Sequence, residues 1–306
     1  MKVSDLKGTR AILVNVVRTV VGVIFLALAK HSLRSHFVSF VFHEVNDQPS
    51  LHTKETNTYS TRDTFSKQID WIVESCSPVD LKNPANLGRA GHCLISFDDG
   101  YRGVAINAIP ELSARGIPFT CFINLETVFG GINSSALAMF ISNRNRRHVV
   151  WADSRPEFFA SALEELGSET IMHLRKYQGP YIDEEDLSQL NMNPLVTLSD
   201  HLHNHWYIPA MTLDEFVKEV KKGEEGLKDY SSFRKFFAAP HGVFPRNRLQ
   251  SLFELGYEAV FADRNEELQT SKVVFPRIDM NERIDTKVKF YGAIAIARLR
   301  GRLLAR

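Results

Sequence analysis

Two adjacent carboxylates at the end of an apolar run constrain this chain more than any other feature. The run at 94–97 leads directly into Asp98 and Asp99, and Gly100 follows at once. An apolar run bounded by glycine is typical of a buried strand that ends in a turn. Side chains alternate between the faces of a strand, but at its end both carboxylates can turn towards one pocket. Burying them costs free energy unless a cation or strong donors compensate, so the pair indicates a metal site or, alternatively, a solvated helix-capping turn.

Short apolar runs alternate with amphipathic stretches along the rest of the chain. We expect strands at 37–42, 94–97, 119–123, 195–198, 235–239, 258–261 and 273–275, and helices at 62–76, around 111–112, from 213 and at 247–255. Thr212 and Glu215 form a capping box at the start of the third helix. This alternation predicts an α/β fold with a mostly parallel sheet, either open or closed as a barrel. The long segment of mixed charge at 128–192 is expected to form an inserted cap with small helices.

The two ends of the chain differ from its middle. We expect an apolar helix at 1–35, a main domain at 36–285 and a basic amphipathic helix at 286–306. The uninterrupted apolar run at 20–29 is shorter than the roughly 20 residues that span a bilayer. We therefore expect the first helix to pack on the domain or lie on a membrane surface, with a cleaved signal as the alternative. The last helix either docks on the core or lies on anionic lipid.

Charge and cysteine content limit the partners and the compartment. Lys and Arg number 37 against 36 Asp and Glu, so no global field attracts nucleic acid. Cys76, Cys93 and Cys121 lie in apolar or amphipathic segments without metal-ligand spacing, and we expect buried free thiols. Free thiols favour a reducing compartment. We expect a cytoplasmic protein with peripheral contact to the inner membrane, and an exported or membrane-anchored form is the alternative.

A histidine cluster follows the apolar run at 195–198. Its sequence is His-Leu-His-Asn-His at 201–205. On a helical turn, residues i and i+4 share a face, so His201 and His205 can bind one cation while His203 points elsewhere. Two imidazoles, one carboxylate and an open position suit Zn²⁺, Co²⁺ or Fe²⁺ used for hydrolysis. Sites in α/β folds gather at the carboxyl ends of strands, which places this pair near the two aspartates.

The motifs resemble those of the polysaccharide deacetylases, the NodB-like enzymes of carbohydrate esterase family 4. The segment 97–100, Phe-Asp-Asp-Gly, resembles their first motif, and 201–205 resembles their His-Ser/Thr-x-x-His motif. The segment 237–242 is similar to their third motif, and 275–278 to their fourth region. Phe-Val-Phe-His-Glu-Val at 40–45 resembles the Tyr-His-x-Val strand of an envelope-polysaccharide subgroup. The resemblance covers most of the chain.

This resemblance implies a distorted (β/α)7-type barrel and a bound divalent metal, with zinc first and cobalt, nickel or iron as alternatives. The metal ligands would be Asp99, His201 and His205. Asp98 would be the general base that takes a proton from water, and the backbone N–H of Tyr101 would stabilise the oxyanion. The third motif would supply substrate-binding residues, which are Pro240, His241 and Gly242.

Three positions depart from the family pattern. Leu202 stands where members often carry Ser or Thr, which removes one hydrogen bond. Ala238 replaces an Arg that orients the base in many members, and Arg277 is our candidate for that role. The late Leu-x-His motif that usually supplies the general acid is missing after Arg277. In the Tyr-His-x-Val subgroup the acid is the N-terminal histidine, which is His43 here, and His241 is the rival.

The leading hypothesis is therefore a metal-dependent N-deacetylase. Its substrate would be an N-acetylated sugar of an envelope polysaccharide or of a lipid-linked glycan precursor. One alternative is an O-acetyl esterase or a small-amide hydrolase on the same barrel. The other is a catalytically silent glycan-binding protein associated with the membrane, which Leu202, Ala238 and the missing late histidine motivate.

Overall fold

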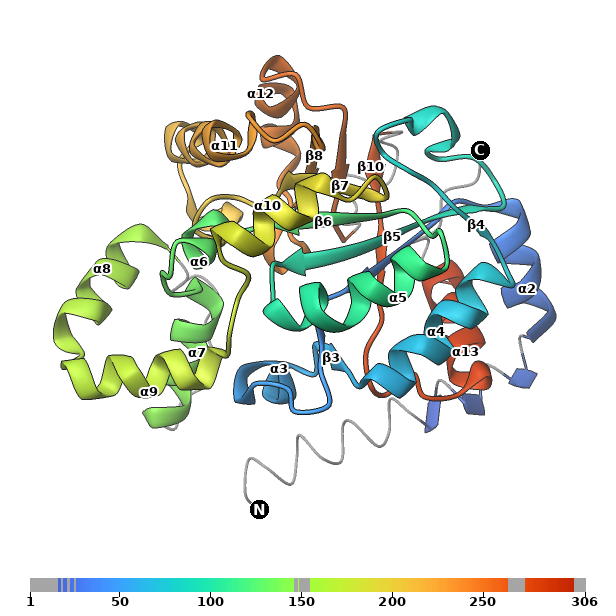
Figure 1. Cartoon of the computed structure of the whole chain (residues 1–306), viewed down its shortest axis with the longest axis horizontal. Helices are drawn as coiled ribbons and strands as arrows, with labels where there is room; N and C mark the ends of the chain where they lie inside the picture. The colour runs from blue at the N-terminus through green and yellow to red at the C-terminus, as the bar shows by residue number, and fades with distance from the viewer. Residues whose placement is uncertain are drawn as a thin grey trace.

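A curved, mostly parallel sheet forms the centre of the protein (Figure 1). The computed structural model describes residues 16–17, 19–20, 23–24, 26–145, 148, 155–263 and 273–299. The strands of this sheet are β1 (Val38–Phe42), β4 (Ser77–Pro78), β5 (His92–Asp99), β6 (Phe119–Ile123), β7 (Val196–Asp200), β8 (Phe233–Ala238), β9 (Ala259–Phe261), β10 (Val274–Phe275) and β11 (Arg277–Asp279). A separate parallel pair joins β2 (Glu44–Val45) to β3 (Tyr59–Ser60).

The order of the strands brings the two edges of the sheet together. The path is β10-β9-β8-β7-β6-β5-β1-β11, with β4 beside β5. Its end strands, β10 and β11, are separated in sequence by Pro276 alone. The sheet therefore has to curl until its edges nearly meet. This confirms the predicted α/β fold and its closure as a distorted barrel.

Helices cover the outside of this barrel, in keeping with parallel strands that need crossover connections. They are α2 (Leu26–Ser35), α3 (Leu51–Thr56), α4 (Arg62–Val73), α5 (Ile109–Ala114), α6 (Leu125–Val128), α7 (Ser134–Arg144), α8 (Pro156–Glu165), α9 (Ser168–Gln178), α10 (Glu184–Met192), α11 (Leu213–Leu227), α12 (Leu249–Glu254) and α13 (Lys287–Leu299). The predicted capping box of α11 is confirmed, since Thr212 and Glu215 each accept a backbone hydrogen bond from the other.

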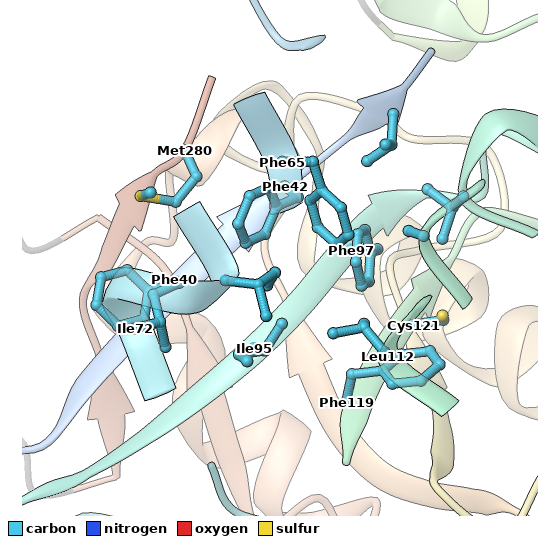
Figure 2. Packing of buried hydrophobic residues seen from close by; sticks show 14 of the residues in the cluster. Phe40, Phe42, Phe65, Ile72, Ile95, Phe97, Leu112, Phe119, Cys121 and Met280 are labelled. Atoms are coloured by element: carbon cyan, nitrogen blue, oxygen red, sulfur yellow. The ribbon is translucent and has the colours of Figure 1, made fainter. Parts of the chain in front are cut away.

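Alternation along the strands divides the apolar side chains between two layers. In β5, Ile95 and Phe97 face the helices, where they pack with residues of α4, α5 and α13. Leu94 faces the barrel interior, in a cluster contributed mostly by strands. Figure 2 shows the outer layer, in which the Phe97 ring lies 5.6 Å from that of Phe42 and 5.8 Å from that of Phe119. Phe97 is the residue immediately before the two carboxylates, and this packing fixes its position.

The segment 128–192 divides into two parts. Helices α7, α8 and α9 project from one side of the barrel in Figure 1 and share a small apolar cluster that includes Leu137, Leu174 and Tyr177. Helix α10 is different, because Leu187 and Leu190 lie in the main cluster between sheet and helices. Helices α7 to α9 thus pack as a separate group, and α10 packs as one of the helices of the barrel.

Both described terminal helices pack on the domain. The side chains of Phe290 and Ile294 in α13 are buried, and the Phe290 ring stacks on Phe40. Lys30 of α2 lies over the ring of Tyr291. Docking on the core thus describes α13 as far as residue 299; residues 300–306 lie outside the described part, as do residues 1–15. Among the described residues, no helix has the length and apolarity needed to cross a bilayer. Contact of the N-terminal stretch with a membrane surface stays a prediction.

All three cysteines are buried free thiols, as predicted.

The packing around Phe97 makes a prediction about stability. We expect Phe97→Ala to lower the free energy of unfolding by roughly 3–5 kcal/mol, because it removes a buried ring that contacts neighbouring phenylalanines. Phe129→Ala is the matched control: Phe129 is 55% exposed, and its loss should change stability by no more than about 0.5 kcal/mol. Urea unfolding followed by circular dichroism measures both variants. Equal losses would contradict the packing described above.

Candidate active site

The two carboxylates end β5 with an abrupt change of backbone direction. Asp98 continues the interior alternation of Leu94 and Ser96, so it points into the barrel. Simple alternation would turn Asp99 outwards, but Asp99 has φ +71° and Gly100 has φ +82°. The left-handed conformation is strained for a residue other than glycine, and such strain concentrates at functional sites. Here it brings Asp98 and Asp99 to the same cavity.

The histidines reach this cavity through a bent loop, and the predicted helical turn is wrong. Leu202 and His205 both have positive φ, at +60° and +58°. His205 Nε2 lies 3.1 Å from Asp99 Oδ1, and His201 Nε2 lies 3.3 Å from the same oxygen. The candidate ligand atoms of these three residues all lie within 4.8 Å of one another. His203 points away, as expected, with Nε2 3.4 Å from Glu126 Oε2.

Neighbouring strands fix the conformation of the histidine loop. Asn124, directly after β6, donates from Nδ2 to the carbonyl oxygens of Leu202 at 3.1 Å and His203 at 2.9 Å. His201 Nδ1 lies 2.9 Å from the carbonyl oxygen of Ala238. A carbonyl can only accept, so Nδ1 carries a proton, and in the neutral imidazole the lone pair lies on Nε2, which faces Asp99. This is the tautomer that a metal ligand needs.

The buried carboxylates at this point need a compensating positive charge. Burial favours the neutral acid, but the imidazoles of His205 and His201 hold the pKa of Asp99 well below its usual range. Burial opposes a charge on His201, yet Asp98 and Asp99 raise the pKa of that imidazole. A proton on His201 or a divalent cation can supply the positive charge. Two imidazole nitrogens and one carboxylate oxygen are a donor set that fits a zinc-type ion with an open position.

The two carboxylate oxygens of Asp98 have different surroundings. Its Oδ2 accepts a 2.5 Å hydrogen bond from Arg277 Nη1 and lies 3.7 Å from His201 Nε2. Its Oδ1 is buried and has no hydrogen-bond partner among the described residues. Arg277 comes from β11, and its side chain is 7% exposed. The contact that the sequence suggested between Arg277 and Asp98 is thus present, and its catalytic role stays a prediction.

Of the other residues predicted for the site, three line the same cavity, of about 250 Å³. His43, His241 and Gly242 line it. His241 has φ +58°, and its ring centroid lies 4.8 Å from that of His205. Pro240 is buried beside these residues without lining the cavity.

Tyr101 follows Gly100 and does not line the cavity. Its side chain is fully buried, and the residue forms an antiparallel bridge with Tyr181. The bridge uses the flanking groups: Arg102 N–H donates to Pro180 O, and Ile182 N–H donates to Gly100 O. In such a pair the N–H of the central residue points away from the partner strand. The Tyr101 N–H is therefore not used by this bridge.

Sequence reasoning missed several residues of the cavity wall. They include His52, Ser135, Asp263 and Asp279. Asp279 was accessible to the alternation rule, because it lies two residues after Arg277 on the same strand. His52 and Ser135 belong to helices α3 and α7, and no spacing in the sequence relates them to the motifs.

Comparisons with known proteins agree with this architecture. A family model described as polysaccharide deacetylase matches residues 88–260, more than half of the chain. No curated protein sequence matches this chain. The structure is similar to IcaB from Ammonifex degensii, with a TM-score of 0.57 and 16% identity over 85% of this chain and 97% of that chain. It is also similar to the Streptococcus pyogenes deacetylase PplD in complex with acetate, with a TM-score of 0.57 and 14% identity over 87% and 98% of the two chains. At these identities the likeness shows the fold alone.

Metal binding is the first test of this site. We expect the purified protein to bind one divalent ion per chain and to lose it to a chelator. His201→Ala should weaken binding by at least roughly tenfold, because one of three ligands is removed. Metal content after dialysis against zinc, measured by mass spectrometry, checks this.

His203→Ala is the matched control, since His203 lies in the same loop but faces Glu126. It should keep its metal. Equal zinc content in the His201→Ala variant and the unmodified protein would refute the assigned ligands.

Proposed function

Because the chain belongs to the polysaccharide deacetylase family, we propose that it is a metal-dependent N-deacetylase. Its substrate is an N-acetylated sugar in an envelope polysaccharide or a lipid-linked glycan precursor. One observation carries the proposal: Asp99, His201 and His205 converge beside Asp98, which has a buried oxygen at the same cavity with no partner in the described part of the chain. The envelope substrate is supported by the Phe-Val-Phe-His-Glu-Val strand, which resembles that of the envelope-polysaccharide subgroup.

A divalent ion held by Asp99, His201 and His205 would supply Lewis acidity, which polarises the acetamide carbonyl and acidifies water. The chain's own groups do the rest. Asp98 Oδ1 accepts the proton of the attacking water, while Arg277 holds Oδ2 and keeps the carboxylate oriented. The N–H of Tyr101 donates to the oxyanion that develops on the carbonyl.

A general acid must then protonate the leaving amine, because otherwise the tetrahedral intermediate returns to substrate. We assign this role to His43. The His241 ring packs directly against His205, a proposed metal ligand. An imidazolium beside a divalent ion is electrostatically unfavourable, so His241 is poorly placed to carry the proton. His43 follows β1, is half-buried and lines the cavity, so it can exchange protons with solvent.

Acetate release tests the activity. The metal-loaded protein should release acetate from N-acetylglucosamine oligomers or lipid-linked acetamido sugars, measured by an enzyme-coupled acetate assay. Asp98→Asn should lower kcat by roughly 10²- to 10⁴-fold with the metal retained, because the amide cannot accept the proton. Asp214→Asn, an exposed change of the same chemistry on α11, should leave kcat unchanged.

Two outcomes would argue against this function. No acetate from any acetamido glycan, with metal bound, contradicts it. Faster release from O-acetylated xylan than from acetamido sugars favours an esterase on the same site.

Dependence on the leaving group tests the general acid. We expect His43→Ala to slow amide hydrolysis by roughly 10²-fold or more while sparing 4-nitrophenyl acetate, whose leaving group needs no proton. Asp98→Asn should slow both reactions, and His241→Ala should act mainly on KM. Steady-state kinetics on the two substrates separates these patterns. If His241→Ala, and not His43→Ala, slows the amide while it spares the ester, His241 is the general acid.

A further inference from the structure

The first described part of the chain carries an exposed apolar face. Every described residue between 16 and 35 is helical. On a helix that advances roughly 100° per residue, five large apolar positions before α2 fall within an arc of about 120°. Their side chains are between 43% and 65% exposed, and they belong to Val16, Val17, Val20, Val23 and Ile24. An exposed apolar face of this kind marks a site of interaction with a protein or a membrane.

The charge around this face favours anionic lipid over a protein partner. The sequence at 6–43 holds no Asp or Glu, and its basic residues are Lys7, Arg10, Arg18, Lys30 and Arg34. The whole chain has a net charge of only +1, so positive charge is concentrated in this stretch. Lys30 and Arg34 are exposed on α2. An apolar helical face with basic residues on both sides is typical of a helix that lies on an anionic membrane surface.

The packing of α13 fixes the direction of the neighbouring helices relative to the cavity. Phe290 stacks on Phe40, in the middle of β1. Further along the helix, Arg298 contacts the ring of His36, just before that strand. Helix α13 therefore runs antiparallel to β1. It starts towards the carboxyl end of β1, and this is the end at which His43 lines the cavity.

Helix α2 runs beside α13 in the same direction. Lys30 lies over the ring of Tyr291, and His36, just after α2, contacts Arg298. The residues before α2 therefore lead towards the carboxyl end of β1. Figure 1 agrees, because the short blue segments between 16 and 24 run from α2 in the direction of the β5 arrow. The exposed apolar face thus lies on the side of α2 that is nearer the cavity end of the barrel.

We propose that this face docks on an anionic bilayer and that the substrate is an acetamido sugar on a lipid carrier. The apolar side chains enter the boundary between headgroups and acyl chains, and the basic residues contact the headgroups. Enzyme and substrate then share one surface, which raises the effective concentration of the substrate at the cavity. The proposal rests on the proposed function, because it chooses the lipid-linked precursor over the finished polysaccharide.

Vesicle flotation with the full chain tests the docking. Binding to vesicles of phosphatidylcholine and phosphatidylglycerol should be at least roughly tenfold tighter than to phosphatidylcholine alone, and high salt should weaken it. Val20→Glu with Ile24→Glu should lower binding to the anionic vesicles at least roughly tenfold, because two charges enter the apolar face. Met172→Glu with Met192→Glu is the matched control. Both side chains are exposed, on α9 and α10, and this variant should bind like the unmodified protein.

Acetate release from two substrates tests the lipid carrier. The unmodified protein should show a kcat/KM at least roughly tenfold higher for a lipid-linked acetamido sugar in anionic vesicles than for soluble N-acetylglucosamine oligomers. The Val20→Glu, Ile24→Glu variant should lose this preference and keep its rate on the soluble oligomers, because neither residue lines the cavity. Equal losses on both substrates would show that the helix supports the fold and would overturn the proposal.

Three further results would overturn the proposal. One is equal binding of the unmodified protein and the Val20→Glu, Ile24→Glu variant to anionic vesicles. Another is binding that does not depend on the anionic lipid. The third is a change from dimer to monomer in the variant, seen by size-exclusion chromatography, with no vesicle binding by the unmodified protein, which would make the face an interface between two copies of the chain.

A second variant keeps the test decisive if Val20→Glu with Ile24→Glu fails to fold. Lys7→Glu with Arg10→Glu changes only charge and should lower binding to the anionic vesicles, whereas unchanged binding would contradict the docking. The two proposals fail separately. If no substrate releases acetate, the proposed function fails and flotation still tests the docking; if soluble oligomers release acetate but no vesicle binds, only the docking fails.

Discussion

Two buried carboxylates at the end of one strand impose a demand for positive charge, and the rest of the site meets it. Arg277 on β11 supplies the positive charge beside Asp98, and the imidazoles that follow β7 face Asp99. Each source lies two strands away from β5, one on either side. In a flat sheet, strands two apart are separated by about 10 Å. Curvature brings their interior side chains together, so the barrel is the condition for the site and not merely its support.

The need to compensate the charge of Asp98 also explains how the chain tolerates Ala238, where many members of the family carry an arginine. Arg277 delivers a guanidinium to Asp98 from a different strand, at 2.5 Å. The backbone of Ala238 is still used, because its carbonyl accepts from His201 Nδ1. The charge on Asp98 is thus compensated, and the proton on His201 Nδ1 is held, without an arginine at 238. The loss of a Ser or Thr at Leu202 is compensated in the same way, because Asn124, directly after β6, holds the backbone of the histidine loop.

Much of this architecture was predictable from the sequence, and the exceptions share a physical cause. Strand positions, the capping box of α11 and the gathering of Asp99 with the histidines follow from periodicity and from the rule for strand ends. The helical turn at 201–205 was wrong because Leu202 and His205 take positive φ, which local sequence disfavours and tertiary hydrogen bonds impose. His52 was missed for a related reason: its place in the cavity wall is fixed by contacts with Tyr101 and Ser135, 49 and 83 residues away.

The energetics of burial bear on whether this site is active or silent. A buried ion pair is weak evidence for stability, because the cost of removing two charges from water offsets much of their attraction. The pair of Asp98 and Arg277, the strained Asp99 and the crowded imidazoles all lie in one cavity. A binding protein that no longer needed hydrolysis would gain stability by replacing them with apolar residues of similar volume. Their presence together in one cavity supports the proposed hydrolase over a silent binding protein.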